Sequence, residues 1–443
     1  MVADTIYALS SGAGLAGVAV VRLSGPAADE VLAALGVTDL PDPRYATLRA
    51  LAAGGVPIDR ALVLRFPGPG SFTGEDVAEL HVHGGRAVLS GLFDAIAATG
   101  LVRMAEPGEF TRRAFENGKL DLTAAEGLAD LVAAQTGAQR RLALRQYDGT
   151  LADLYEGWRA RLIDLMGHAE AEIDFSDEEL PDGLKDQTDA RVDALRNEIA
   201  AHLGDADRGE HIRGGFPIVI LGAPNVGKSS IINILSSREI AIVSEVAGTT
   251  RDVIEVQLDL GGYAVTISDT AGIRAAGDEI EAEGVRRAEA RAADAALRLV
   301  VVDATSEAIP DRVRPLITDN AVVIRNKIDL LDGVPARSQV PNGARTVDVS
   351  AATGEGLDAL MGLLRKEVSS RLGGQEGALP TRRRHRDALA EAVAALSHVA
   401  DAAYPELAAE DVRVALRALG KITGCVDIDE VLDTVFRDFC IGK

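Results

Sequence analysis

The feature that most constrains this chain is an apolar run followed at once by a glycine-rich loop. Ile218–Leu221 reads as a buried strand, and Gly222 then opens the pattern G-x-x-x-x-G-K-S, which closes on Ser229. Helix-compatible residues follow from Ser230 to Leu235. Glycines in such a loop let backbone N–H groups turn toward phosphate oxygens, and the helix start adds partial positive charge. The stretch therefore predicts a P-loop rather than a glycine turn without a ligand.

Two side chains of this loop have expected roles of their own. Lys228 is expected to reach the β- and γ-phosphates of a nucleotide, and Ser229 to offer its hydroxyl to Mg²⁺. The loop residues predicted to contact the nucleotide are Asn225, Val226, Gly227, Lys228, Ser229 and Ser230.

A second motif closes the strand that should lie beside the P-loop strand. It reads Asp269, Thr270, Ala271, Gly272. Asp269 is expected to approach Mg²⁺ through water, and the N–H of Gly272 to meet the γ-phosphate.

Two further motifs indicate which base is bound. Asn326-Lys327-Ile328-Asp329 ends another apolar strand. A carboxylate there can accept two hydrogen bonds from the N1–H and amine of guanine, and adenine offers no such pair. Asn326 and Lys327 would brace and cover the base, and Ser350-Ala351 fits the loop that contacts guanine O6. Four motifs in order, each after a strand, predict a GTPase.

The residues near the γ-phosphate differ from a Ras-like arrangement. Ile273 stands where a water-orienting Gln is expected, so another residue must hold the attacking water, and the nearest candidates are on the acidic segment 278–283. Glu281 is one candidate, although a solvated carboxylate at a helix start is an equally weighted alternative. Asn225 with carbonyls of the switch segment could bind a monovalent cation, and Thr250 could complete Mg²⁺ coordination. The switch residues predicted to line the nucleotide are Ser244, Glu245, Val246, Ala247, Gly248, Thr249 and Thr250.

Length and composition limit the remaining possibilities. With 443 residues the chain is too long for a single core. A net charge of −22 argues against a protein that coats nucleic acid through bulk charge. Two cysteines, Cys425 and Cys440, indicate a reducing compartment, and the chain shows neither a signal peptide nor eighteen consecutive apolar residues. We expect a cytoplasmic protein that does not enter a membrane.

The order of patterns predicts a multidomain α/β protein. Residues 1–118 read as an α+β domain, and residues 213–377 as an inserted Ras-like P-loop GTPase domain with a mostly parallel sheet. Residues 119–212 and 378–443 read as one discontinuous helical domain, because neither stretch alone could bury its apolar stripes.

Several local predictions accompany this division. Thr123 and Glu126 form a capping box that should start a helix, and Gly204–Gly215 reads as a charged linker. The basic run Arg382–Arg386 could touch tRNA, but a solvated run beside a helix is favoured. His81 and His83 suggest a metal only weakly, because no third ligand with suitable spacing is visible.

These residues together resemble the MnmE family, also called TrmE, of tRNA-modification GTPases. The resemblance covers essentially the whole chain. It rests on Gly-Ala-Pro-Asn-Val-Gly-Lys-Ser-Ser, Ala-Gly-Thr-Thr-Arg-Asp and Asp-Thr-Ala-Gly-Ile-Arg, and above all on the end Phe439-Cys440-Ile441-Gly442-Lys443. It implies a homodimer that acts with the flavoprotein MnmG on tRNA. The product would carry a carboxymethylaminomethyl or aminomethyl group at C5 of the wobble uridine.

The resemblance also implies site residues that motifs alone do not give. A reduced folate such as 5-formyltetrahydrofolate would be bound by the N-terminal domain, which also dimerises. Potassium would make the G domains pair and stimulate GTP hydrolysis, with Glu281 activating the water. Cys440 is either a catalytic thiol or a buried helix-end cysteine, with equal weight. The implied positions are Arg22, Glu79, Lys119 and Lys443 for folate, Asn225, Ser244, Val246 and Thr249 for K⁺, and Ser229 and Thr250 for Mg²⁺.

A ribosome-assembly GTPase is the alternative from another functional class. Such a protein would want a C-terminal RNA-binding module with a Gly-x-x-Gly loop and a basic face, and neither is visible. The alternative is therefore disfavoured.

Overall fold

The structure is a computed structural model, and it separates into two compact units. Unit 1 comprises Met1–Ala129, Gln146–Leu180 and Ala402–Lys443, and unit 2 comprises Asp130–Arg145 and Pro181–Asp401. The residues that the structure describes are 4–174, 184–238, 255–269, 295–331, 340–341, 343–374, 377–402 and 404–426, with single positions at 432, 435, 436, 439 and 442.

Unit 1 is built on a six-stranded sheet in the order β3-β4-β5-β2-β1-β6. Its strands pair antiparallel, except that β1 and β6 run parallel. The strands are β1 Thr5–Leu9, β2 Ala16–Ser24, β3 Thr47–Ala53, β4 Val56–Phe66, β5 Val77–Gly84 and β6 Val102–Met104.

Strict alternation along these strands gives the sheet two different faces. One face carries Val21, Leu23 and Leu80 into a core shared with helices α1 (Ala28–Ala34) and α2 (Arg86–Ala98). The opposite face carries a smaller apolar cluster of Ile6, Ala8, Ala105 and Phe110, and Phe110 belongs to helix α3 (Glu109–Glu116). Arg22 and Glu79 lie on this second face, because they alternate with the core residues of β2 and β5.

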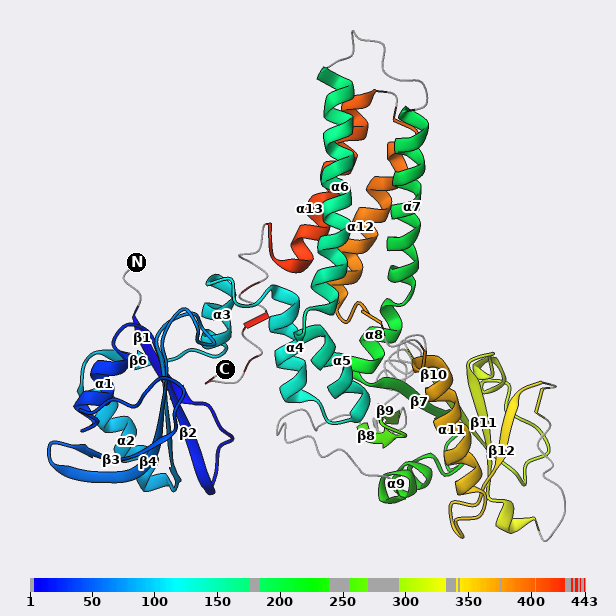
Figure 1. Ribbon diagram of the computed structural model, residues 1–443. Helices are drawn as coiled ribbons and strands as arrows, with labels where there is room; N and C mark the ends of the chain where they lie inside the picture. Colours follow the sequence, from blue (N-terminus) through cyan, green and yellow to red (C-terminus); the bar gives the residue numbers. More distant parts are fainter. Residues whose placement is uncertain are drawn as a thin grey trace, which may run out of the picture. The chain divides into compact units, whose positions relative to one another are not determined.

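Further helices of unit 1 come from two separate parts of the sequence, one before and one after the nucleotide-binding part. Helix α6 (Thr150–Asp174) packs along α13 (Pro405–Thr423), as Figure 1 shows. Helix α4 (Leu122–Ala133) begins one residue before Thr123. The Oδ1 atom of Asp121 accepts hydrogen bonds from the backbone N–H groups of Thr123 and Ala124, at 2.7 and 3.1 Å. The predicted capping box is therefore wrong, because Thr123 lies inside the helix and its N–H donates to Asp121.

Unit 2 contains the second six-stranded sheet, in the order β12-β11-β10-β7-β9-β8. All neighbours run parallel except β8 and β9. The mostly parallel sheet is thus confirmed, and β9 lies beside the P-loop strand β7. The strands are β7 Phe216–Gly222, β8 Glu255–Leu260, β9 Tyr263–Asp269, β10 Leu297–Asp303, β11 Ala321–Asn326 and β12 Arg345–Asp348, with helices α9 Lys228–Arg238 and α11 Leu357–Leu372.

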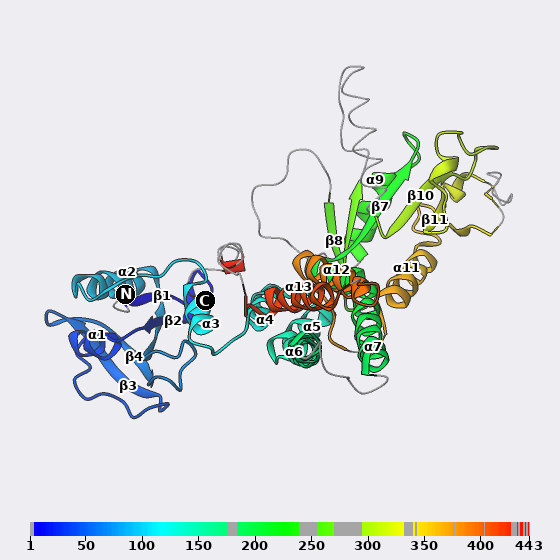
Figure 2. The same ribbon diagram turned by 90° about the horizontal axis from the view of Figure 1, so that it is seen from above.

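Helices that the structure describes outside the nucleotide-binding sequence also belong wholly or mostly to unit 2. Helices α7 (Leu184–Gly204) and α12 (Arg383–Val399) pack side by side in both views (Figure 1 and Figure 2). Helix α5 (Gly137–Tyr147) adds Ala138 and Leu142 to the large core around β7 and β9. The predicted linker Gly204–Gly215 is wrong, because helix α8 (Ala206–Gly214) fills it.

The chain enters and leaves the nucleotide-binding part through two segments that touch. A Cβ atom at Gly209 of α8 would lie 2.0 Å from the carbonyl oxygen of Pro380, so only glycine fits there. The Asp130 carboxylate binds Arg213 on the incoming segment at 2.9 Å and Arg382 on the outgoing one at 3.0 Å. We call this contact the junction.

The basic run Arg382–Arg386 is not simply solvated, which corrects the favoured interpretation. Arg382 is mostly buried in its pair with Asp130, and Arg386 pairs with Asp207 and Glu210 of α8. His385 is fully buried. Arg383 alone of these is largely exposed, with a pair to Asp387 at 3.7 Å.

None of the helices within the described ranges combines the length and apolar character that a membrane-spanning helix requires.

Candidate functional site

The P-loop connects the end of β7 to the start of α9, as its sequence predicts. Gly222 has φ +146, and a Cβ atom there would lie 2.3 Å from the carbonyl oxygen of Val301 on β10. Gly227 has φ +98, and a Cβ atom there would lie 2.2 Å from Nδ2 of Asn326. Both glycines are thus required by close packing as well as by backbone conformation.

Lys228 turns back over the loop that precedes it. Its Nζ atom donates to the carbonyl oxygens of Gly222 and Ala223, at 3.0 and 2.9 Å. The residue is buried, and burial lowers the pKa of Lys228 while the carboxylate of Asp269 acts in the opposite direction. Burial disfavours the charged form of Lys228, and a negatively charged phosphate group beside the ammonium would favour that form again.

Two oxygen-bearing side chains meet at the start of α9. The Ser229 hydroxyl donates to Oδ2 of Asp269 at 3.0 Å, because β9 runs parallel to β7 and ends beside the loop. Hydroxyl and carboxylate oxygens are the hard ligands that Mg²⁺ prefers, so this pair fits the ion. Asn225 is exposed and has φ +62, a conformation that few residues other than glycine adopt.

The base-recognition motif is tied directly to the P-loop. Asn326 is buried, and its Nδ2 donates to the carbonyl oxygen of Val226 at 2.8 Å. Its Oδ1 accepts from the backbone N–H of Ala351 at 3.0 Å. The Ser350 hydroxyl donates to Oδ1 of Asp329 at 2.6 Å. One buried amide therefore joins the P-loop to the two loops predicted to read guanine.

Asp303 is a participant that the motif analysis missed. This residue ends β10, and its carboxylate binds Nζ of Lys327 at 2.7 Å. Burial raises the pKa of Asp303, but hydrogen bonds from Lys327 and Thr305 outweigh it and lower the pKa. The signal was available, since an apolar strand that ends in Asp resembles the strand that ends in Asp269.

Part of the predicted nucleotide site lies outside the described residues. Ser230 is exposed on the first turn of α9. The positions outside are Ser244, Glu245, Val246, Ala247, Gly248, Thr249, Thr250, Thr270, Ala271, Gly272 and Glu281.

A second group of predicted residues lies on the open face of the unit 1 sheet. Arg22 and Glu79 face each other across β2 and β5, and both Nε and Nη2 of Arg22 donate to Oε1 of Glu79, at 3.0 and 2.9 Å. Oε2 of Glu79 lies 3.2 Å from Nε2 of His81. Lys119 is exposed in the turn after α3. Within the described part of the chain no group of three metal-ligating side chains occurs.

The end of the chain returns to the same sheet. A Cβ atom at Gly442 would lie 2.0 Å from the carbonyl oxygen of Leu9, and the Ser10 hydroxyl donates to the carbonyl oxygen of Gly442 at 2.9 Å. Leu9 follows Ala8, which is the register partner of Arg22. Cys440 and Lys443 lie outside the described residues.

In unit 2, a P-loop and an Asn-Lys-x-Asp loop follow strands of one parallel sheet and are joined by Asn326. This arrangement defines a P-loop guanine-nucleotide-binding protein.

Comparison with known proteins places the chain more closely. A family model described as the MnmE helical domain matches residues 122–440, and one described as the N-terminus of the GTP-binding protein TrmE matches residues 5–119. The tRNA modification GTPase MnmE of Paramagnetospirillum magneticum is 54% identical over 442 residues, covering 99% of this chain and 100% of that protein. MnmE of Rhodospirillum rubrum is 52% identical over 458 residues, covering 100% of both chains. The chain belongs to the MnmE family of tRNA modification GTPases.

Among solved structures, the G domain of the T. maritima FeoB iron transporter matches with a TM-score of 0.26 and 21% identity, covering 35% of this chain and 98% of that chain. That likeness is too weak to bear on function.

Proposed function

We propose that the chain binds GTP in unit 2 and that GTP hydrolysis drives the modification of tRNA. With the flavoprotein MnmG, it would install a carboxymethylaminomethyl or aminomethyl group at C5 of the wobble uridine. The relatives named above are tRNA modification GTPases, and the similarity extends over their full length, which supports this assignment. The observation that carries the nucleotide part is the buried Asn326, which links the P-loop to the loops of Asp329 and Ala351.

The proposed roles follow from the chemistry of each group. Lys228 and the N–H groups at the start of α9 compensate the phosphate charges. Ser229 binds Mg²⁺ together with Thr250, and Asp269 acts through water. Mg²⁺ would neutralise charge that develops on the phosphates. Asp329 accepts two hydrogen bonds from guanine, while Lys327, held by Asp303, covers the base.

A potassium ion is proposed beside the phosphates, with Asn225 as one ligand and Ser244, Val246 and Thr249 as the others. Ile273 cannot orient water, so Glu281 is assigned to hold the attacking water. The exposed position of Asn225 in the P-loop supports the assignment, because a side-chain amide oxygen is a common cation ligand.

The N-terminal site is proposed to bind a reduced folate such as 5-formyltetrahydrofolate. Arg22, Glu79, Lys119 and Lys443 are the proposed contacts. The contact of Gly442 with Leu9 supports a site that includes the end of the sequence, because Leu9 follows Ala8, the register partner of Arg22.

The protein is proposed to act as a cytoplasmic homodimer. Leu48 and Leu62 support this, since they are exposed, opposite each other on β3 and β4, and on the face of Arg22. The predicted domain boundaries and the two roles considered for Cys440 stay predictions.

Hydrolysis of GTP by the full-length chain in potassium and sodium buffers of equal ionic strength tests the cation assignment. We expect at least about tenfold faster hydrolysis in potassium, since a positive charge at this place is worth about 10³–10⁵ in rate. Asn225→Ala should remove the difference between the two ions. Equal rates for the unsubstituted chain would contradict the assignment.

Mass analysis of wobble uridines tests the pathway. Cells that lack this protein should lose the modified base, and normal modification there would overturn the proposed function.

A further inference from the structure

We propose that Phe72 and Phe110 are positioning residues of the N-terminal ligand site, because their rings hold the Arg22 guanidinium in the orientation in which it meets its ligand. The inference rests on the proposed role of Arg22 in binding a reduced folate. It adds two residues that neither a motif nor the family resemblance points to.

The two rings and the guanidinium form one group. The Cζ atom of Arg22 lies 5.6 Å from the ring centroid of Phe72 and 5.7 Å from that of Phe110. Both distances are within the range of an attractive cation–π contact. Phe110 is fully buried and Phe72 is half-buried, so the rings form a wall beside Arg22 rather than an exposed surface.

The hydrogen bonds of Arg22 leave part of the guanidinium for a ligand. Nε and Nη2 both donate to Oε1 of Glu79, and Oε2 of Glu79 lies against His81. Among the residues that the structure describes, Nη1 has no hydrogen-bond partner. Its two N–H groups fit an acceptor oxygen, and a folate offers acceptors in its pterin carbonyl and its glutamate carboxylates.

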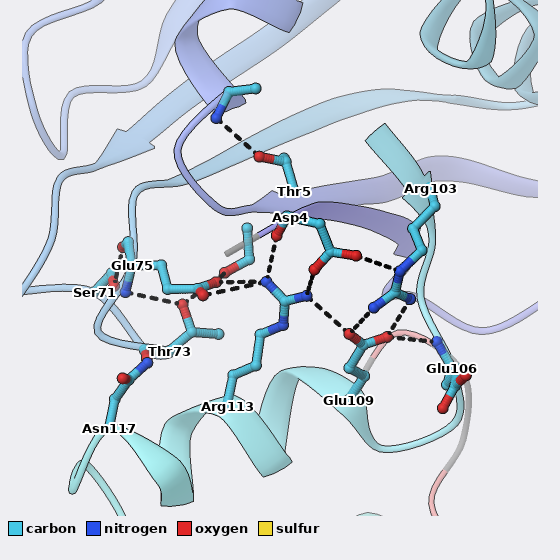
Figure 3. A network of polar contacts seen from close by, with 12 residues as sticks. Asp4, Thr5, Ser71, Thr73, Glu75, Arg103, Glu106, Glu109, Arg113 and Asn117 are labelled. Carbon is cyan, nitrogen blue, oxygen red and sulfur yellow. Dashed lines mark hydrogen bonds and ion pairs between the residues drawn. The ribbon is translucent and has the colours of Figure 1, made fainter. Parts of the chain in front are cut away.

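A partly buried polar network fixes the two segments that carry the rings (Figure 3). Arg113 of α3 donates from Nη1 to Glu75, which follows Phe72 in the loop before β5, at 3.1 Å. The same nitrogen donates to the carbonyl oxygen of Asp4 at 2.7 Å, and Nη2 donates to Glu109 at 2.8 Å. One side chain thereby ties the helix of Phe110 to the loop of Phe72 and to Asp4, the residue before β1.

Further contacts hold the loop of Phe72 on both sides. The hydroxyls of Ser24 and Thr73 lie 2.7 Å apart, and Asn117 donates to the carbonyl oxygen of Thr73 at 2.7 Å. Ser24 also donates to Oε2 of Glu75 at 2.7 Å. Ser24 lies two residues after Arg22 on β2, so the network connects the ring-bearing loop to the strand of the arginine itself.

The rings should raise the affinity for the ligand because they orient the Arg22 side chain before the ligand binds. A free arginine side chain has many rotamers, and a ligand that immobilises it bears that entropy loss. With the rings in place, the guanidinium is already oriented. Loss of one aromatic face should therefore weaken ligand binding without touching the nucleotide site.

Calorimetric titration of the full-length chain with 5-formyltetrahydrofolate tests the proposal. Phe72→Leu removes the ring but keeps an apolar side chain, and we expect about five- to thirtyfold weaker binding. Phe72→Trp keeps an aromatic face and should bind within about threefold of the unsubstituted chain. Phe93→Leu is the matched control, because Phe93 packs on Tyr7 in the core beneath the opposite sheet face, and its affinity should not change.

The possible outcomes separate the inference from the proposed function. If Arg22→Ala leaves folate affinity unchanged, the proposed role of Arg22 is wrong. If Arg22→Ala abolishes binding while Phe72→Leu stays within twofold of the unsubstituted chain, the positioning role is wrong. The role is also wrong if Phe72→Trp binds as weakly as Phe72→Leu, or if Phe93→Leu weakens binding equally. GTP hydrolysis by the control variant Phe93→Leu should be unchanged.

Discussion

The two six-stranded sheets of this protein carry their sites in opposite ways. In unit 2 the site strands run parallel, so the residues that end β7, β9, β10 and β11 gather at one edge. In unit 1 the strands that carry the site run antiparallel, and Arg22 and Glu79 meet in mid-strand from positions 57 residues apart. Site residues at the ends of parallel strands therefore lie in short sequence motifs. A pair such as Arg22 and Glu79 comes from distant parts of the sequence, and no single motif contains both residues.

The largest expected effect tests whether the two sites are independent. Lys228→Ala removes the buried ammonium from the P-loop, and the rate of GTP hydrolysis should fall by about 10²–10³. Single-turnover hydrolysis measures the rate. Folate affinity of the same variant should stay unchanged, and a parallel loss of both would break the comparison.

A smaller effect concerns the base. Asp329→Asn keeps the shape of the side chain but replaces one acceptor oxygen by an amide donor, so GTP affinity should fall by about 10- to 100-fold. Xanthine carries an oxygen where guanine carries its amine, and xanthosine triphosphate should gain affinity. Competition between the two nucleotides measures the change. An unaltered preference for GTP would remove Asp329 from the site.

The smallest effect concerns acid stability, in which the two units should differ. Burial lowers the pKa of His202 on α7 to about 4, and Asp205 acts in the opposite direction. The folded state then binds fewer protons than the unfolded state, so this stability is complete above pH 6.5 and is lost as pH falls toward 4. Between pH 6.5 and 5 the free energy of unfolding of unit 2 should fall by roughly 2 kcal/mol. Burial also lowers the pKa of His211, which adds in the same direction.

Unit 1 should resist the same acidification. Burial raises the pKa of Glu109, but hydrogen bonds from Arg103 and Arg113 outweigh it and hold the pKa below 4.5. A lowered carboxylate pKa stabilises the fold above the unfolded value, and this contribution is lost only below it. Hydrogen exchange of α7 and of β2 at pH 7 and pH 5 compares the units, and His202→Gln should flatten the response of α7. Equal loss of protection in β2 would contradict the difference.

The sequence predicts the site on the parallel sheet of unit 2 better than the site on the antiparallel strands of unit 1. The P-loop, the neighbouring strand that ends at Asp269 and the parallel sheet all follow from local patterns and are confirmed. Arg22 and Glu79 came only from the family resemblance, since their pairing depends on strand register. Phe72 and Phe110 have no local signal, because each contacts Arg22 through a different segment.

The two wrong predictions about local structure have physical causes. Gly204–Gly215 looks like a linker because charges and glycines outnumber apolar residues, but Ala206 and Ile212 bury against the rest of unit 2 and hold α8 in place. Thr123 and Glu126 match a capping box, yet the N–H groups of Thr123 and Ala124 donate to Asp121, which takes the Thr123 N–H that Glu126 would need. Tertiary contacts thus override local preference at α8, whereas at α4 one local cap replaces another.

The junction, where Gly209 meets Pro380, has a consequence for how such a chain can be divided. Because the two crossing points almost touch, the entire stretch between them closes a loop whose ends are already together. A short bridge could join Gly209 to Pro380 after that stretch is excised, with little penalty in backbone geometry. Conversely, the excised piece has adjacent ends and suits circular permutation or transplantation into another scaffold.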